Sequence, residues 1–281
     1  MSWQLICIIV LIISVIQTEA NRTLQLNPII LNFWRSLFAT IALSLILFSP
    51  DLNISMPFIL SGILTGVVSA LLSTTIFHLS KQYGSKIAAL STQTNTLIIF
   101  FMWLPFDWNN FIASPLHSFS ATICVLIGVG ASYSLSRSPL IRRPLKILFL
   151  LSVVISISVI VGKRVLPENI SMNDLLFYSF IIMATQTFVS AGAMWVRNYS
   201  FSLTPRMLKG SFGLGCVVLI GCPMSWLAIV ATPNPAYFHA ILMTIPIILL
   251  IYHKFFKIDD YIPLIPSIIL TFSMMLLAYI S

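Results

Sequence analysis

About ten apolar stretches of helix-spanning length alternate with short polar loops along this chain of 281 residues, and its positive charge lies almost entirely in every second loop. Hydrophobic residues make up 58% of the chain and charged residues only 8%. A bilayer core about 30 Å thick takes roughly 20 apolar residues to span as a helix, whose backbone satisfies its own hydrogen bonds. The sequence therefore predicts an all-α polytopic membrane protein.

The expected transmembrane helices cover residues 2–21, 28–48, 57–79, 86–104, 118–135, 146–162, 173–195, 209–231, 235–253 and 262–281. Ten such spans leave no room for a soluble catalytic or nucleic-acid-binding domain. The formal net charge of +8 is then explained by loop lysines and arginines that orient the chain in the membrane, and no nucleic acid partner is expected. All four cysteines fall within spans, where small apolar packing is their expected role.

The lysines and arginines are divided unequally between the two sides of the predicted membrane. Twelve of the 15 lie in the loops that follow the odd-numbered spans, and only Lys163 and Arg164 lie in the other loops. The remaining one, Arg35, lies within the second span. Because cytoplasmic loops carry an excess of basic residues, the odd-numbered loops are expected in the cytoplasm and both termini outside. The expected location is a bacterial inner (plasma) membrane.

An internal repeat is visible half a chain apart. The first span ends in Asn-Arg-Thr-Leu at 21–24, and the sixth ends in Lys-Arg-Val-Leu at 163–166, 142 residues later. Each leads into a short link that holds asparagine and proline. Since five spans per half is an odd number, the halves 1–140 and 141–281 would insert in opposite orientations. Inverted repeats of this kind are typical of secondary transporters, whose substrate site lies near the midplane.

Three local patterns resemble the drug/metabolite transporter superfamily, in particular its EamA-like ten-helix members. They are NPIILNFWR at 27–35, YGSKIAAL at 83–90 and a proline, Pro246, in the ninth span. The resemblance implies two inverted five-helix repeats around a cavity lined mainly by helices 1, 3, 4, 6, 8 and 9, with helices 5 and 10 peripheral. It also implies alternating access by rocking of the halves. Ten-helix members usually place both termini in the cytoplasm, which differs from the orientation that the charge distribution predicts.

Arg35 is the candidate site residue whose placement within the membrane costs the most free energy. It lies about two turns inside the second span, where an arginine costs up to about 2.5–3.5 kcal/mol at the helix centre. Charges within the membrane usually face a cavity or a partner. A guanidinium in such a cavity could bind a substrate carboxylate or phosphate. It could equally extend to nearby lipid headgroups or pair with Glu19.

Three further titratable side chains are candidates for the site. Glu19, near the end of the first span, could bind a substrate ammonium group or titrate, or it could pair with Arg22. His78 closes the third span with Thr75 one turn earlier on the same face, and His239 lies in the ninth span. Either histidine could relay protons or simply lie at the interface.

A run of six polar residues at 91–96 crosses the fourth span. Six consecutive residues cover nearly the whole circumference of a helix, so they cannot all face lipid at low cost. The amides Gln93 and Asn95 are the costliest and are expected to point inward, toward a substrate or toward other helices. The remaining candidates lie in spans 1, 7 and 8 and are Gln17, Gln186 and Trp226.

The first functional hypothesis is a secondary transporter for a small polar metabolite, such as an amino acid, a related zwitterion or an organic anion. The rival hypothesis is a flippase component for lipid-linked substrates or a non-transporting membrane scaffold. The chain contains no HExxH, GxSxG, P-loop or CxxC pattern, so an enzyme is not expected, and neither a cofactor nor a metal is implied. The expected partners are a small-molecule substrate and the lipid bilayer, and the chain is expected to act as a monomer.

Overall fold

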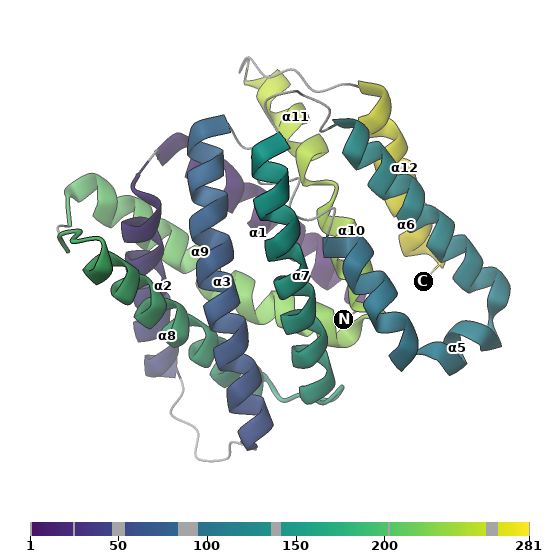
Figure 1. The fold of residues 1–281 in the computed structure, drawn as a ribbon, viewed down its shortest axis with the longest axis horizontal. Helices are drawn as coiled ribbons and strands as arrows, with labels where there is room; N and C mark the ends of the chain where they lie inside the picture. Colours follow the sequence, from purple (N-terminus) through teal and green to yellow (C-terminus); the bar gives the residue numbers. More distant parts are fainter. Residues whose placement is uncertain are drawn as a thin grey trace.

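The computed structural model describes residues 2–24, 26–46, 54–83, 95–135, 142–201, 203–256 and 264–280. Within these ranges every regular element is a helix (Figure 1). The labelled helices are α1 (Trp3–Leu24), α2 (Pro28–Ile46), α3 (Met56–Tyr83), η1 (Leu104–Phe106), α5 (Trp108–Ala113), α6 (Pro115–Leu135), α7 (Arg142–Val165), α8 (Met172–Val196), α9 (Pro205–Ala231), α10 (Pro235–Leu242), α11 (Ile245–Phe255) and α12 (Leu264–Ile280).

Six helical segments in the described ranges are long and apolar enough to cross a membrane. They are α1, α2, α3, α8, α9 and the consecutive pair α10–α11, and they coincide with the expected spans 1, 2, 3, 7, 8 and 9. The expected spans 5, 6 and 10 are also helical, as parts of α6, α7 and α12. The fourth expected span is helical over residues 95–103, and its earlier part lies outside the described residues.

The outer surface of the helical assembly is apolar. Many large hydrophobic side chains are exposed, and the most exposed include Leu116, Phe188, Trp195 and Phe255, at 77–80%. A soluble monomer rarely exposes apolar area on this scale, because water penalises it. Together with the long apolar helices, this surface indicates an integral membrane protein.

The helices that surround the centre of the molecule pack closely because several contact positions are small. The main packing partners are α2 with α8, α3 with α8, α2 with α9, α1 with α9 and α3 with α7. At Gly66 of α3, an added Cβ would lie 2.8 Å from the backbone oxygen of Ile182 in α8. Glycine therefore allows the two helix backbones to approach. By contrast, α6 and α12 pack mainly on each other, at the opposite edge of the molecule from α2 and α8 (Figure 1).

Two of the spanning segments are irregular, one at a proline within the helix and one at a break between two helices. Pro223 lies inside α9, where it lacks a backbone N–H and its ring crowds the preceding turn. The pair α10–α11 is broken at Met243 and Thr244, which form a turn between the two helices. These irregularities matter for the site, because both neighbour residues that line the central cavity.

Candidate functional site

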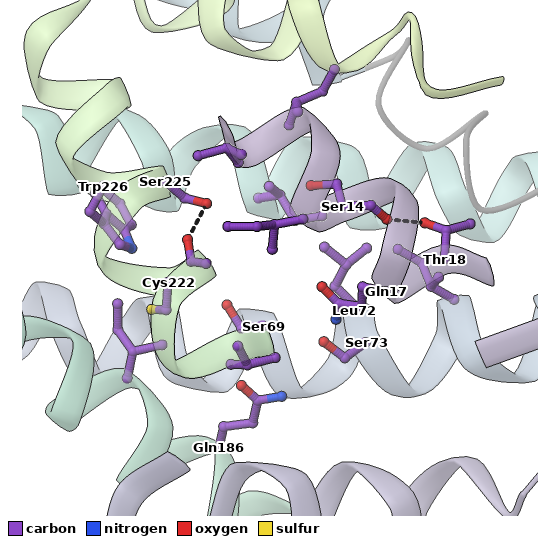
Figure 2. Close-up of a pocket in the computed structure, with 18 of the residues that line it drawn as sticks. Ser14, Gln17, Thr18, Ser69, Leu72, Ser73, Gln186, Cys222, Ser225 and Trp226 are labelled. Carbon is purple, nitrogen blue, oxygen red and sulfur yellow. Dashed lines mark hydrogen bonds between the residues drawn. The ribbon is translucent and has the colours of Figure 1, made fainter. Parts of the chain in front are cut away.

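A cavity of about 320 Å³ lies among the central helices. Its lining comes from both halves of the chain, since α1, α2, α3 and residue 95 contribute from the first half and α7, α8, α9, α10 and α11 from the second. Figure 2 shows polar side chains of α1, α3, α8 and α9 around this space, with Gln186 pointing up from α8 toward Ser69 of α3. A space of this size is in the range of small-molecule sites in proteins.

Arg35 of α2 is the one lysine, arginine, aspartate or glutamate among the described residues that line the cavity. Its side chain is only 2% exposed. Nη2 donates a hydrogen bond to Oγ of Ser73 at 2.8 Å, and the guanidinium carbon lies 4.6 Å from the centre of the Phe77 ring. Nε and Nη1 have no hydrogen-bond partner within the part of the chain that the structure describes. The cavity wall therefore holds a buried positive charge, two of whose nitrogens lack a protein partner among the described residues.

A buried amide cluster fixes one wall of the cavity. Gln186 Nε2 donates to Oδ1 of Asn32 at 2.6 Å, and Asn32 Nδ2 donates to Oγ of Ser190 at 2.8 Å. Asn32 lies three residues before Arg35 on α2, on the same face of the helix. These bonds orient the Gln186 amide and leave its Oε1 without a partner. The Oδ1 atom of Asn95, which also lines the cavity, has none either.

His239 and Trp226 are two further lining residues that could contact a ligand. His239 of α10 is 8% exposed, and neither of its ring nitrogens has a hydrogen-bond partner. Trp226 of α9 packs edge-on against Tyr178, with ring centres 5.0 Å apart. A buried polar atom without a partner is costly. The unpaired atoms of Arg35, Asn95, Gln186 and His239 therefore identify the cavity as a place where a polar molecule would be stabilised.

Several of the residues that the sequence predicts for the site lie together in the lining of the cavity. Those in its lining are Gln17, Arg35, Asn95, Gln186, Trp226 and His239.

Other predicted site residues lie elsewhere. The Oε2 atom of Glu19 lies 3.0 Å from Nε2 of His253 in α11, and neither residue lines the cavity. Thr75 is half-buried and His78 is exposed, and both are also absent from the lining. Gln93 lies outside the described residues.

Sequence reasoning missed Asn32, Ser73 and Phe77, which hold Arg35 and Gln186 in place. Ser73 and Phe77 are four residues apart on α3 and thus share a face of the helix. Once Arg35 is assigned to a neighbouring helix, this spacing could predict that both side chains contact it. Within the described ranges, no group of three or more histidine, cysteine, aspartate or glutamate residues could hold a metal ion.

Replacing Asn32 with alanine is expected to destabilise the protein by about 1–3 kcal/mol, because it leaves buried polar atoms of Gln186 and Ser190 unpaired. Thermal unfolding in detergent measures this effect. Ser44→Ala on the same helix is the control, since the Ser44 hydroxyl is exposed and bonds only to its own helix, at the carbonyl of Ile41. Equal melting of the two variants would contradict a structural role for the amide cluster.

No family model matches this chain, and no curated protein is significantly similar to it. The resemblance to drug/metabolite transporters thus rests on the expected five-plus-five layout of spans and on the local residue patterns.

Proposed function

We propose that this protein is a secondary transporter that moves a small, carboxylate-bearing metabolite across a bilayer by alternating access. The observation that carries the proposal is the buried guanidinium of Arg35, which has two unpartnered nitrogens and faces a cavity lined by both halves of the chain. Burying a charge without a paired counterion is unfavourable. Such a charge within a membrane-spanning helix marks a functional position.

The polar atoms of the cavity favour a particular kind of ligand. Arg35 offers positively charged N–H donors, which carboxylates accept in short, strong hydrogen bonds. Asn95 and Gln186 offer carbonyl oxygens, which accept hydrogen bonds from N–H or O–H groups. The rest of the lining is largely apolar, with leucine, isoleucine, valine and Trp226. The substrate class is thus a small organic anion or amino acid that combines a carboxylate, one or more hydrogen-bond donors and a modest apolar part.

The architecture proposed for this transporter is ten spans in two inverted five-helix halves, residues 1–140 and 141–281, as in EamA-like members of the drug/metabolite superfamily. The contribution of both halves to one cavity supports it. So does the position of α6 and α12, the fifth and last spans in this scheme, which pack on each other at the edge. The proposed setting is a bacterial inner membrane, with the basic odd-numbered loops in the cytoplasm and the chain acting as a monomer.

A thermal-shift screen of the detergent-purified protein tests the substrate class. The arms are monocarboxylates, zwitterionic amino acids, phosphate esters and simple amines. A ligand at about 100 times its dissociation constant stabilises its protein by about 2.7 kcal/mol, so a hit is readable. We expect carboxylates or amino acids to stabilise the protein and amines to have no effect.

Uptake of the hit compound into proteoliposomes then tests transport. Proteoliposomes preloaded with the unlabelled compound are expected to take up the labelled compound from outside by exchange. Binding without uptake would favour a non-transporting membrane subunit, and the absence of any hit in all four arms would contradict the proposed site.

A further inference from the structure

The sequence places Lys163 and Arg164 in a loop that otherwise carries no basic residue, and the proposed cavity does not use either side chain. In the structure, Lys163 lies in the last turn of α7 and its ammonium group contacts the end of α9. Nζ donates to the carbonyl oxygens of Ile229 at 2.9 Å and Val230 at 3.1 Å, and also to that of Thr232. All three hydrogens of the ammonium group thus have backbone acceptors.

These contacts stabilise the end of α9. The last carbonyls of a helix lack partners within the helix and form the negative end of its dipole, so a cation there is favourable. The ammonium group also lies 5.4 Å from the centre of the Trp103 ring. Arg164, the next residue, instead lies over Phe106, with its guanidinium carbon 5.1 Å from the ring centre. Lys163 therefore joins α7 to α9, and Arg164 does not.

The residue before Lys163 joins the same two helices on the cavity side. At Gly162, an added Cβ would lie only 2.4 Å from ring carbons of Trp226, so the tryptophan ring packs directly on the backbone of α7. Trp226 lines the central cavity. It lies three residues before Ile229, that is, about one helical turn from the carbonyl groups that Lys163 holds.

A second hollow, of about 990 Å³, lies at the Lys163 end of this contact, because Lys163 and Val230 both line it. Its lining includes Lys163, Glu168, Val230 and Pro233, and it shares no residue with the lining of the central cavity. Val230 and Trp226 are one turn apart on α9, and one faces the hollow while the other faces the cavity. The contact between α7 and α9 thus separates the two spaces.

Pro223 is the position at which α9 can bend most easily. Pro223 interrupts the hydrogen-bond ladder of α9 just before the segment 224–231, which carries both Trp226 and the carbonyl groups of Ile229 and Val230. A bend at Pro223 would carry the whole segment away from α7. The only polar link between α7 and this segment in the described residues is the Lys163 ammonium group.

We propose that Lys163 is the latch of a gate formed by residues 224–231, and that releasing its ammonium group from the end of α9 joins the 990 Å³ hollow to the central cavity. The proposal rests on the proposed function in assigning a transport role to this gate. The structure, with the latch engaged, is the state closed at the Lys163 end.

Cys222 provides a native reporter for the gate, because it lines the central cavity on the turn just before Trp226. The test measures the rate at which a water-soluble maleimide modifies Cys222 in the full-length, detergent-purified protein. Cys216 is exposed and is replaced by serine in every sample, whereas Cys7 and Cys124 are buried. Lys163→Met keeps most of the length of the side chain but removes the ammonium group and its three donors.

We expect Lys163→Met to raise the modification rate of Cys222 roughly tenfold, since losing even one charge-assisted hydrogen bond shifts a two-state equilibrium by about that factor. The matched control is Arg164→Met, which removes the neighbouring cation and is expected to leave the rate unchanged. Gly162→Ala is a second route to the open gate, because its methyl group displaces Trp226 without altering Lys163. If Lys163→Met does not fold, the Cys222 modification rate of Gly162→Ala tests the gate in its place.

Parental rates of Cys222 modification in both Lys163→Met and Gly162→Ala would overturn the latch. A parallel rise in modification of Cys124, which lies in α6 away from the gate, would also overturn it by showing a general loosening of the fold. The assay needs no substrate, so the two proposals fail separately. If the screen finds a carboxylate ligand but both variants keep the parental rate of Cys222 modification, the latch alone is refuted. If the variants react faster but the screen finds no ligand, the substrate class alone is refuted.

Discussion

Arg35→Met is expected to make the ligand-free protein more stable and to abolish binding of the compound found in the screen. Replacing even a paired buried charge by well-packed apolar side chains of similar volume is often neutral or stabilises a protein by about 1–4 kcal/mol, and a charge without a counterion has less to lose. Nε and Nη1 of Arg35 have no partner, and the one bond of Nη2, to Ser73, is neutral at its acceptor end. Arg35 is therefore expected to lower the stability of the ligand-free protein, and we attribute its presence to ligand binding.

The measurement is thermal unfolding in detergent with and without the ligand. Arg206→Met is the control, because Arg206 is exposed and donates a single hydrogen bond, of 3.2 Å, to the carbonyl oxygen of Leu24. It is expected to change stability little and to keep ligand binding. A clear fall in the melting temperature of ligand-free Arg35→Met would show instead that the guanidinium holds α2 to α3, as a structural residue.

Gly66→Val is expected to destabilise the protein by about 3 kcal/mol or more, at the upper end of the range for overpacked cores. A Cβ at this position would lie 2.6 Å from Cβ of Thr185 and 2.8 Å from the backbone oxygen of Ile182. Neither atom belongs to the flexible end of a side chain, so α3 and α8 would have to separate. Because α8 also carries Gln186, the cavity would lose its amide wall.

Gly192→Ala on α8 serves as the control for the glycine prediction. An added Cβ there meets nothing within 4 Å, so the variant should gain roughly 0.5–1 kcal/mol from the better helix propensity of alanine. Both effects are measured by thermal unfolding. A Gly66→Val protein that melts like the parent would mean that α3 and α8 do not approach as closely as described.

The transmembrane helices could be predicted from the sequence because their signal is local. Twenty apolar residues between polar loops specify a spanning helix almost without regard to what surrounds it. Arg35 could be singled out for a similar reason, since its cost within the membrane is high wherever the helix lies. The amides Gln17, Asn95 and Gln186 follow from the same argument about polar groups in an apolar environment.

The partners of these residues were not predictable from the sequence. Small hydroxyl side chains recur every four residues on α3, at 61, 65, 69 and 73, but this spacing does not show which neighbouring helix that face meets, and so it does not place Ser73 and Phe77 against Arg35. Distance along the chain also hides contacts, since Glu19 in the first helix pairs with His253 near the other end of the sequence. Periodicity identifies a helix, but the rotation of that helix about its axis is set by its neighbours.

The single unbalanced charge of the cavity has an electrical consequence. With Arg35 as its one charged lining residue among those described, the empty cavity carries one positive charge, and a bound monoanion would neutralise it. One elementary charge that crosses a full membrane potential of 100 mV exchanges about 2.3 kcal/mol with the field. If the substrate is a monoanion, voltage therefore acts on the return of the empty carrier, and the loaded cavity crosses the membrane without net charge.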